Sequence, residues 1–205
     1  MGSICGWSGK GLGSVMSQQA IKAMLKKNGG VAHAKSESSY DDTGALSICK
    51  GLSATNYYKQ DGVRVAIVGS PTWSDQELAG IAENQGTGAA LIKAWQDYGK
   101  DLLSKLHGPF ALAVQEGDEA LIAIDRIGIH SLSYSLQNGV FIFSTSTGSV
   151  ARHPRVDRRI DPQAIFNYVY FYDIPAPGTI FAGVEKLLTA QYVHFHNGRL
   201  EKDFY

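Results

Sequence analysis

Two histidines and two cysteines of this 205-residue chain are the first candidates for metal ligands or nucleophiles. His194 and His196 lie two residues apart, so a strand would place them on one face. Two histidines without a third ligand are weak evidence for zinc, which takes four ligands, and a solvated strand face is favoured. The cysteines are Cys5 and Cys49. Cys49 is interpreted either as a buried structural thiol or as a redox partner of Cys5.

Three other segments carry charge or glycine patterns that are found in functional sites. Residues 9–14 are glycine-rich but lack the spacing of a phosphate-binding loop, so a flexible loop over a pocket mouth is favoured. Asp125 and Arg126 are expected to form an ion pair that fixes a turn. The basic residues between 152 and 159 are interspersed with Asp157, which favours a solvated loop over a phosphate site.

The length leaves room for one substantial domain or at most two small ones, and a single domain over residues 1–205 is expected. Apolar residues make up 44% and charged residues 19%, which is typical of a packed core. The 19 basic and 19 acidic residues balance, so no net charge attracts nucleic acid or an anionic membrane. No apolar run approaches the ~18 residues of a membrane span, and no signal peptide is recognisable. Two cysteines cannot form a disulfide scaffold, which favours a cytoplasmic location.

Residues 106–144 read as the core of a β-sheet. The expected strands are Pro109–Gln115, Glu119–Asp125, Ser131–Ser135 and Gly139–Ser144. Short apolar runs separated by compact turns are typical of consecutive antiparallel strands. Asn138-Gly139 is a strong hairpin signal, because a type I′ turn needs positive φ at both central residues.

The remaining elements group strands together and insert helices between the groups, which predicts the α+β class with antiparallel sheets. Residues 33–43 are expected to be a polar loop. Further strands are expected at Gly44–Cys49, at Val63–Gly69, and in a hairpin of Ala190–Phe195 and Leu200–Tyr205 across Asn197-Gly198. Helices are expected from an N-cap at Ser17 to a stop at Gly29-Gly30, from Ser74–Glu77 onward, over Ala89–Leu106, and from Asp161-Pro162 onward.

Several segments, in order along the chain, resemble one family. Leu106–Val114 looks like the strand "LxGxFAFAI", and Ile124–Tyr134 is similar to "ARDRxGIKPLYY". Residues 160–187 resemble "DxxAlxxYL…vPxPxTIFxGVxKL", and Cys5-Gly6-x-x-Gly9 matches "CGIxG". These motifs belong to class II glutamine amidotransferase domains of the asparagine synthetase type.

The resemblance implies both a fold and a reaction. The fold is an N-terminal-nucleophile (Ntn) hydrolase-like four-layer αββα sandwich of two antiparallel sheets between helices. The reaction is hydrolysis of glutamine to glutamate and ammonia for a C-terminal synthetase domain, which would begin near Tyr205. No cofactor is expected in this domain, and ATP and Mg²⁺ are expected only in the synthetase domain. The expected partners are glutamine or a related small molecule, that synthetase domain or subunit, and a second copy in a homodimer.

In the resemblance, Cys5 takes the place of the family's nucleophile, whose thiolate attacks the amide carbon. The family's base is the free α-amine of that same cysteine, with a pKa of about 8. Here Cys5 follows Met1-Gly2-Ser3-Ile4, so its nitrogen is a peptide amide. Glutaminase activity therefore requires removal of those four residues; otherwise Cys5 is a small buried thiol in the first strand.

The positions that match the family's substrate contacts are mostly changed. The "RLSI" strand corresponds to Ala45-Leu46-Ser47-Ile48, so the arginine that clamps the glutamine carboxylate is Ala45. The "NGE" turn corresponds to Val68-Gly69-Ser70, where Gly69 retains an N–H for an oxyanion hole and Val68 has no side-chain donor. The "SDxE" aspartate, which binds the ammonium group, falls near Thr87. The expected pocket therefore combines Cys5 and Gly69 with the substrate-binding positions Ala45, Ser47, Ile48, Cys49, Val68, Ser70 and Thr87.

Two functions remain open at this point. The first is a glutaminase domain of an asparagine synthetase-like amidotransferase. The second is a degenerate, catalytically inactive domain that serves as a structural, binding or regulatory module and docks through the loops at Trp73 and Pro175–Pro177.

Overall fold

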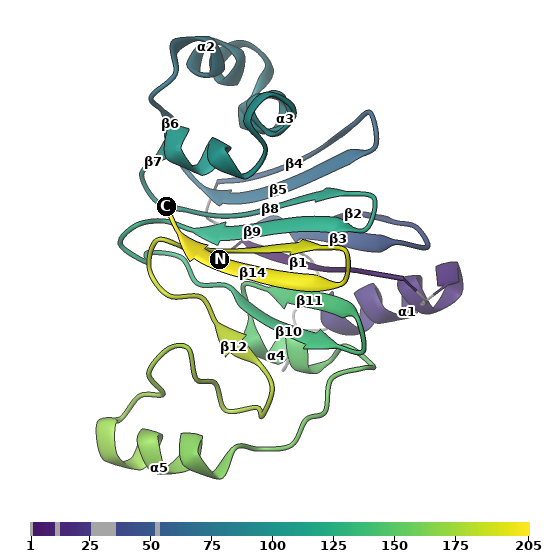
Figure 1. The fold of residues 1–205 in the computed structure, drawn as a ribbon, viewed down its shortest axis with the longest axis vertical. Helices are drawn as coiled ribbons and strands as arrows, with labels where there is room; N and C mark the ends of the chain where they lie inside the picture. The colour runs from purple at the N-terminus through teal and green to yellow at the C-terminus, as the bar shows by residue number, and fades with distance from the viewer. Residues whose placement is uncertain (1, 11–12, 26–35, 52–53) are drawn as a thin grey trace.

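A computed structural model describes residues 2–10, 13–25, 36–51 and 54–205, which form two face-to-face antiparallel sheets with helices on their outer sides (Figure 1). The first sheet has the strand order β12-β10-β11-β1-β3-β2 and the second β14-β13-β9-β8-β5-β4. The strands of the first sheet are β1 (Ser3–Ser8), β2 (Ser36–Tyr40), β3 (Gly44–Cys49), β10 (Ser133–Gln137), β11 (Val140–Ser144) and β12 (Glu185–Lys186). Those of the second are β4 (Thr55–Gln60), β5 (Val63–Gly69), β8 (Phe110–Glu116), β9 (Glu119–Ile124), β13 (Gln191–His196) and β14 (Arg199–Phe204).

Helices cover the outer face of each sheet, which confirms the predicted four-layer αββα sandwich. The helices are α1 (Gly13–Leu25), α2 (Gln76–Gln85), α3 (Thr87–Tyr98), the 3₁₀ helix η1 (Gly99–Lys105), α4 (Thr147–Ala151) and α5 (Pro162–Phe171), and a short ribbon pairs β6 (Thr72–Trp73) with β7 (Leu106–His107). Residues of α1 and α4 pack on the first sheet, and residues of α3 and η1 pack on the second. A third cluster, which contains Phe141, Phe143 and Phe195, fills the space between the sheets. Because side chains alternate along a strand, each sheet contributes to two apolar layers.

The four strands that were predicted within residues 106–144 as consecutive neighbours form two hairpins in different sheets. β8 pairs with β9 in the second sheet, and β10 pairs with β11 in the first. The chain crosses between the sheets in the loop of residues 125–132, which begins at Asp125. Asp125 is fully buried, and its carboxylate accepts hydrogen bonds from the backbone N–H groups of Ile127 (3.2 Å), Ile129 (3.0 Å) and His130 (3.1 Å). The prediction of consecutive pairing was wrong because local periodicity carries no information about which strands become neighbours.

Several other local predictions are confirmed. The strands Gly44–Cys49 and Val63–Gly69 are confirmed, and so are the two Asn-Gly hairpins, with φ of 50° and 72° at Asn138 and Gly139 and 51° and 74° at Asn197 and Gly198. The helix starts at Asp75 and Asp161 are confirmed, because each carboxylate accepts N–H groups of the first turn.

Three helix and loop predictions were wrong. Ser17 is not an N-cap: α1 already begins at Gly13, and the Ser17 hydroxyl donates to the Gly13 carbonyl oxygen at 2.7 Å. The single helix over Ala89–Leu106 ends at Tyr98, where Gly99 has φ of 54°, and continues as a 3₁₀ helix. The polar loop at 33–43 contains the edge strand β2, whose alternating exposure follows from its alternating contact with the sheet. Residues 33–35 and the stop at Gly29-Gly30 lie outside the described residues.

Candidate functional site

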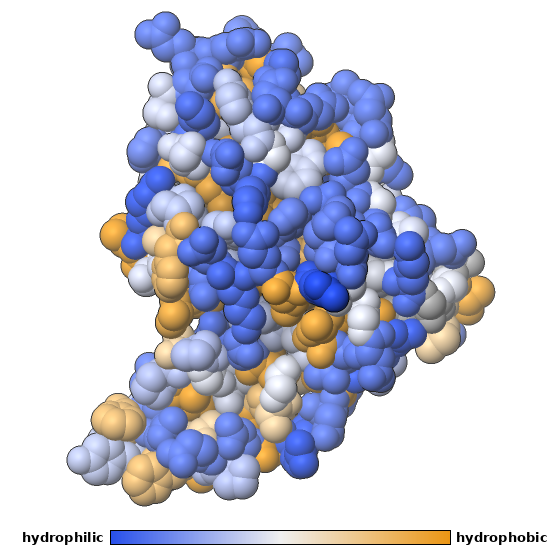
Figure 2. Space-filling view, viewed as in Figure 1, coloured by the Kyte–Doolittle hydropathy of each residue, from blue (hydrophilic) through white to orange (hydrophobic). Residues whose placement is uncertain are grey.

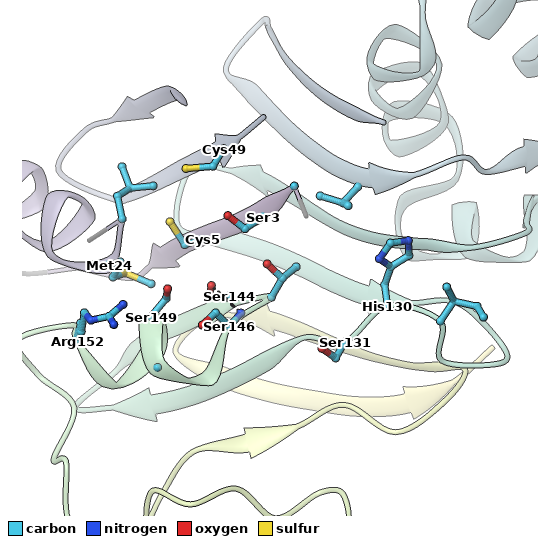
Figure 3. Close-up of a pocket in the computed structure, with 16 residues that line it drawn as sticks. Ser3, Cys5, Met24, Cys49, His130, Ser131, Ser144, Ser146, Ser149 and Arg152 are labelled. Carbon is cyan, nitrogen blue, oxygen red and sulfur yellow. Dashed lines mark hydrogen bonds between the residues drawn. The ribbon is translucent and has the colours of Figure 1, made fainter. Parts of the chain in front are cut away.

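The site lies at one end of the sandwich, where β1 begins and β3, β5 and β11 end. A pocket of about 420 Å³ opens there between α1, α4 and the 125–132 loop (Figure 3). The described residues that line it are Gly2, Ser3, Cys5, Met24, Leu25, Cys49, Val68, Ile129, His130, Ser131, Ser144, Thr145, Ser146, Gly148, Ser149 and Arg152.

Beside its apolar residues, the lining carries hydroxyl groups and basic rather than acidic side chains. Arg152 and His130 lie toward opposite ends of the pocket, with Ser144, Ser146 and Ser149 along one wall between them (Figure 3). None of the described lining residues is an Asp or a Glu. A free amino acid carries an ammonium group that needs an anionic partner when it is taken out of water, and the described lining residues supply no carboxylate for it.

Cys5 lines the pocket as a strand residue and not as a chain terminus. It is the third residue of β1 and is paired with Ser47 on one side and Ser144 on the other. Only 4% of its surface is exposed, and burial, followed by the neighbouring Cys49, raises the pKa of the Cys5 thiol far above its ordinary value. The thiol is therefore protonated at neutral pH, and a protonated thiol is a poor nucleophile.

The raised pKa leads to a chemical prediction. In the native protein at neutral pH, Cys5 should react with iodoacetamide at least roughly tenfold more slowly than in the urea-unfolded chain, because little thiolate is present and the sulfur is buried. Peptide mass spectrometry after timed quenching measures the two rates. Equal rates at Cys5 would mean that the thiol is accessible and ionised, contrary to its burial.

The residue before Cys5 belongs to the folded core. Ile4 faces the apolar layer between the sheets and has no solvent-accessible surface. Its N–H donates to the Thr145 hydroxyl (3.1 Å), and its carbonyl oxygen accepts from the Thr145 N–H (3.0 Å) and the Ser144 hydroxyl (2.8 Å). Removal of residues 1–4 would therefore remove a core side chain, these hydrogen bonds and the pairing of Ser3 and Ile4 with β3.

The "ALSI" strand brings only its end to the pocket. Cys49 lines it, and the register of β1 with β3 places Cys49 diagonally across from Cys5, on the same face of the sheet. Ala45 is fully buried under α1 beside Trp7, and Ile48 faces the layer between the sheets. The Ser47 hydroxyl donates to the Glu37 carbonyl oxygen at 3.0 Å. Ala45, Ser47 and Ile48 are not among the lining residues.

Of the "VGS" turn, Val68 lines the pocket and its two neighbours do not. The Gly69 N–H, the expected oxyanion donor, donates to the Ala54 carbonyl oxygen at 2.9 Å. The Ser70 N–H donates to the Pro109 carbonyl oxygen at 3.0 Å. Both amides are therefore occupied by backbone partners in this structure.

Thr87 lies away from the pocket. It is the first residue of α3, which packs on the outer face of the second sheet, against β4 and β5. The adjacent Gly88 has no room for a side chain because Tyr58 of β4 lies against it. The structure thus brings together Cys5, Cys49 and Val68, and leaves Thr87 in a different layer.

The sequence reasoning missed the serine-rich wall, Arg152 and His130. The run Ser144-Thr145-Ser146-Thr147 was a signal, because hydroxyl residues directly after a buried strand are typical of a helix start. Nothing local indicated that Arg152, at the end of α4, reaches the same pocket. His130 is placed by the buried carboxylate of Asp125, which binds its backbone N–H.

The other candidate groups take structural roles. His194 bonds Glu119 at 2.5 Å, and no group of three or more His, Cys, Asp or Glu side chains suited to a metal occurs in the described ranges. The prediction of an Asp125–Arg126 ion pair was wrong, because the two side chains bind other groups. Asp125 binds backbone N–H groups, whereas Arg126 donates to the Leu106 carbonyl oxygen (2.7 Å) and lies over the Tyr205 ring. Lys10, from the glycine-rich segment, pairs with Asp118 at 3.3 Å.

None of the described helices has the length and apolar character that a membrane crossing requires.

Known proteins resemble this chain in sequence and in fold. The family model described as "glutamine amidotransferase domain" matches residues 81–205. Asparagine synthetase [glutamine-hydrolyzing] 1 of Bacillus subtilis is 31% identical over 101 residues, which are 47% of this chain and 16% of the relative.

Solved structures share the fold at low identity. The allosteric regulatory enzyme of purine biosynthesis superposes with a TM-score of 0.59 and 10% identity, over 98% of this chain and 48% of that one. Glutamine phosphoribosylpyrophosphate amidotransferase from B. subtilis superposes with a TM-score of 0.54 and 11% identity, over 100% of this chain and 49% of that one. The chain thus spans about half of these structures and a smaller share of the curated relative. Because the family model matches more than half of this chain, the chain belongs to the glutamine amidotransferase domain family.

Proposed function

We propose that this domain does not hydrolyse glutamine and acts instead as a binding or regulatory module of an asparagine synthetase-like amidotransferase. The observation that carries the proposal is the position of Cys5 in the middle of β1, behind the buried Ile4. The family's chemistry needs a terminal amine as its base, and a peptide nitrogen within a strand has no basic lone pair to accept a proton.

The remaining parts of a glutamine site are also replaced. Ala45 cannot clamp a carboxylate, since that takes a guanidinium or another donor pair. Val68 has no side-chain donor for an oxyanion, and loss of one such donor costs about a hundred- to a thousandfold in turnover. The Gly69 N–H is bonded to the Ala54 carbonyl oxygen. These changes affect substrate binding and oxyanion stabilisation, in addition to the missing base, so restoring one of them would not restore activity.

In this proposal the pocket binds a small molecule other than glutamine, and the ligation chemistry belongs to a synthetase partner. ATP and Mg²⁺ would be used by that partner and not by this domain. The unbridged thiols of Cys5 and Cys49 fit a reducing, cytoplasmic setting.

The test is incubation of the purified protein with glutamine and enzymatic measurement of glutamate. We expect release no faster than with the Cys5→Ala variant. A second form, in which a site-specific protease exposes Cys5 as the first residue, should also be inactive and should unfold at lower urea because Ile4 is lost from the core. Glutamate release that disappears in Cys5→Ala would instead establish the glutaminase function.

A further inference from the structure

Helix α5 presents an apolar surface that this fold does not cover. From Ile165 to Tyr172 every residue except Asn167 is a large apolar or aromatic one, and each of these is between 50% and 88% exposed. Figure 2 shows several hydrophobic side chains, among more hydrophilic ones, on this helix, which projects at the lower left of the view. Within α5 only Ala164 is buried. A helix that is apolar on all sides is normally found inside a protein.

Hydrogen bonds at both ends hold α5 in place, although its sides are exposed to solvent. At its start the Asp161 N–H donates to the Ile180 carbonyl oxygen (3.0 Å), and the Asp161 carboxylate caps the Gln163 N–H (2.9 Å). After its end the Ile174 carbonyl oxygen accepts a hydrogen bond from the Lys186 side chain at 2.7 Å. Phe166 and Tyr170 stack in parallel along one side with ring centroids 6.1 Å apart. The exposed surface is therefore pre-ordered, which lowers the entropy cost of binding.

The exposed apolar area, summed over all sides of the helix, is in the range of a stable interface. At about 200 Å² for each aromatic side chain, the five aromatics of this segment alone expose roughly 650 Å². The largest apolar patch of an ordinary monomer is about 300–600 Å², and a stable dimer buries about 800 Å² on each partner. With the aliphatic side chains added, α5 approaches that second value.

The charges around α5 favour a second copy of this chain as the partner. No charged side chain lies between Pro162 and Tyr172, so the surface can meet its own copy without repulsion. Arg159, which is exposed and lies 3.7 Å from the Asp157 carboxylate of its own chain, precedes the helix, and the exposed Asp173 follows it. In a two-fold symmetric pair of antiparallel helices, each Arg159 faces the Asp173 of the other copy. This complementarity is what an isologous contact requires.

We propose that α5 is the contact surface of a homodimer, in which two copies pack their α5 helices antiparallel. The inference is independent of whether the domain hydrolyses glutamine. It assigns the apolar helix to a second copy of this chain, with Phe166, Val169 and Tyr170 at the centre and the Arg159–Asp173 pairs at the two ends.

Sedimentation velocity over a concentration series tests the proposal. We expect reversible dimers for the unaltered chain and a dissociation constant at least roughly tenfold weaker for Val169→Asp, since this change places a charge in a dry contact. Val15→Asp is the matched control, because Val15 is also a helical valine and is 69% exposed against 70% for Val169. It should leave the dimer unchanged. Circular dichroism verifies that both variants are folded.

A charge swap tests the antiparallel arrangement. Asp173→Arg should weaken the dimer roughly three- to tenfold through its two symmetry-related pairs, and the added change Arg159→Asp should restore it. The proposal is overturned if the unaltered chain stays monomeric up to its solubility limit, which would leave α5 to a different domain or protein. It is also overturned if Val169→Asp dimerises as tightly as the unaltered chain.

Discussion

Replacement of Asp125 by alanine is expected to lower the free energy of unfolding by about 4 kcal/mol or more. The carboxylate is fully buried and accepts N–H groups from Ile127, Ile129 and His130, with a longer contact of 3.4 Å from Phe110. Each buried donor left without a partner costs about 1–3 kcal/mol. Alanine removes every acceptor at once, and the side chain that it replaces has no exposed surface. Urea denaturation followed by tryptophan fluorescence measures the change.

Two companion variants define the cause. Asp125→Asn keeps the Oδ1 that binds Ile127 and Ile129 but turns an amide NH₂ toward the N–H groups of His130 and Phe110, so an intermediate loss is expected. Asp42→Ala removes an exposed carboxylate and should change stability by less than about 0.5 kcal/mol. A small effect of Asp125→Ala would mean that the crossing loop holds its shape without this carboxylate.

The sequence predicted those parts of the fold that depend on neighbouring residues. Asn138-Gly139 and Asn197-Gly198 specify type I′ turns whatever surrounds them, because few residue pairs accept two consecutive positive φ angles. The buried strand Val63–Gly69 was recognisable from its apolar run alone. The motifs around Asp125 and Pro175 added the layer order of the fold through the family resemblance.

The errors lie where long-range pairing decides the structure. β9 and β10 look like successive strands of one meander, yet the buried carboxylate of Asp125 ends one sheet and redirects the chain to the other. The edge strand β2, SESSY, has no apolar run, so only its pairing with β3 makes it a strand. Local pattern cannot report a partner that lies elsewhere in the chain.

The pocket was predictable only as far as the family motifs extended. Cys5, Cys49 and Val68 converge as the matched motifs indicated. Arg152 and the serine wall carry no motif of their own and reach the pocket because α4 follows β11 directly. Thr87 fell in another layer because α3 packs outside the second sheet, and sequence spacing does not specify a layer.

Replacement of Gly69 by alanine is expected to cost about 3 kcal/mol or more. Gly69 has φ of 115°, where a side chain is strained by about 1–3 kcal/mol. A Cβ atom there would also lie 2.2 Å from the Pro109 carbonyl oxygen and 2.9 Å from the Phe110 Cα. Both contacts are with the backbone of the paired segment, which can give way only by opening the β5–β8 ladder at its end. Thermal unfolding measures the loss.

Gly62→Ala is the matched control that separates the two causes. Gly62 lies directly before β5 and also has a positive φ, 84°, but a Cβ there would meet no atom within 4 Å. Its loss should therefore reflect the backbone strain alone, about 1–2 kcal/mol. The excess at Gly69 then measures the close approach of β5 to β8 at the edge of the pocket, where the same Cβ would lie 3.0 Å from the His130 Nε2. Equal losses for the two variants would show that this approach can relax. In that case packing would not require a glycine at position 69. The present explanation of Gly69 without an oxyanion role rests on this packing constraint together with the hydrogen bond to Ala54.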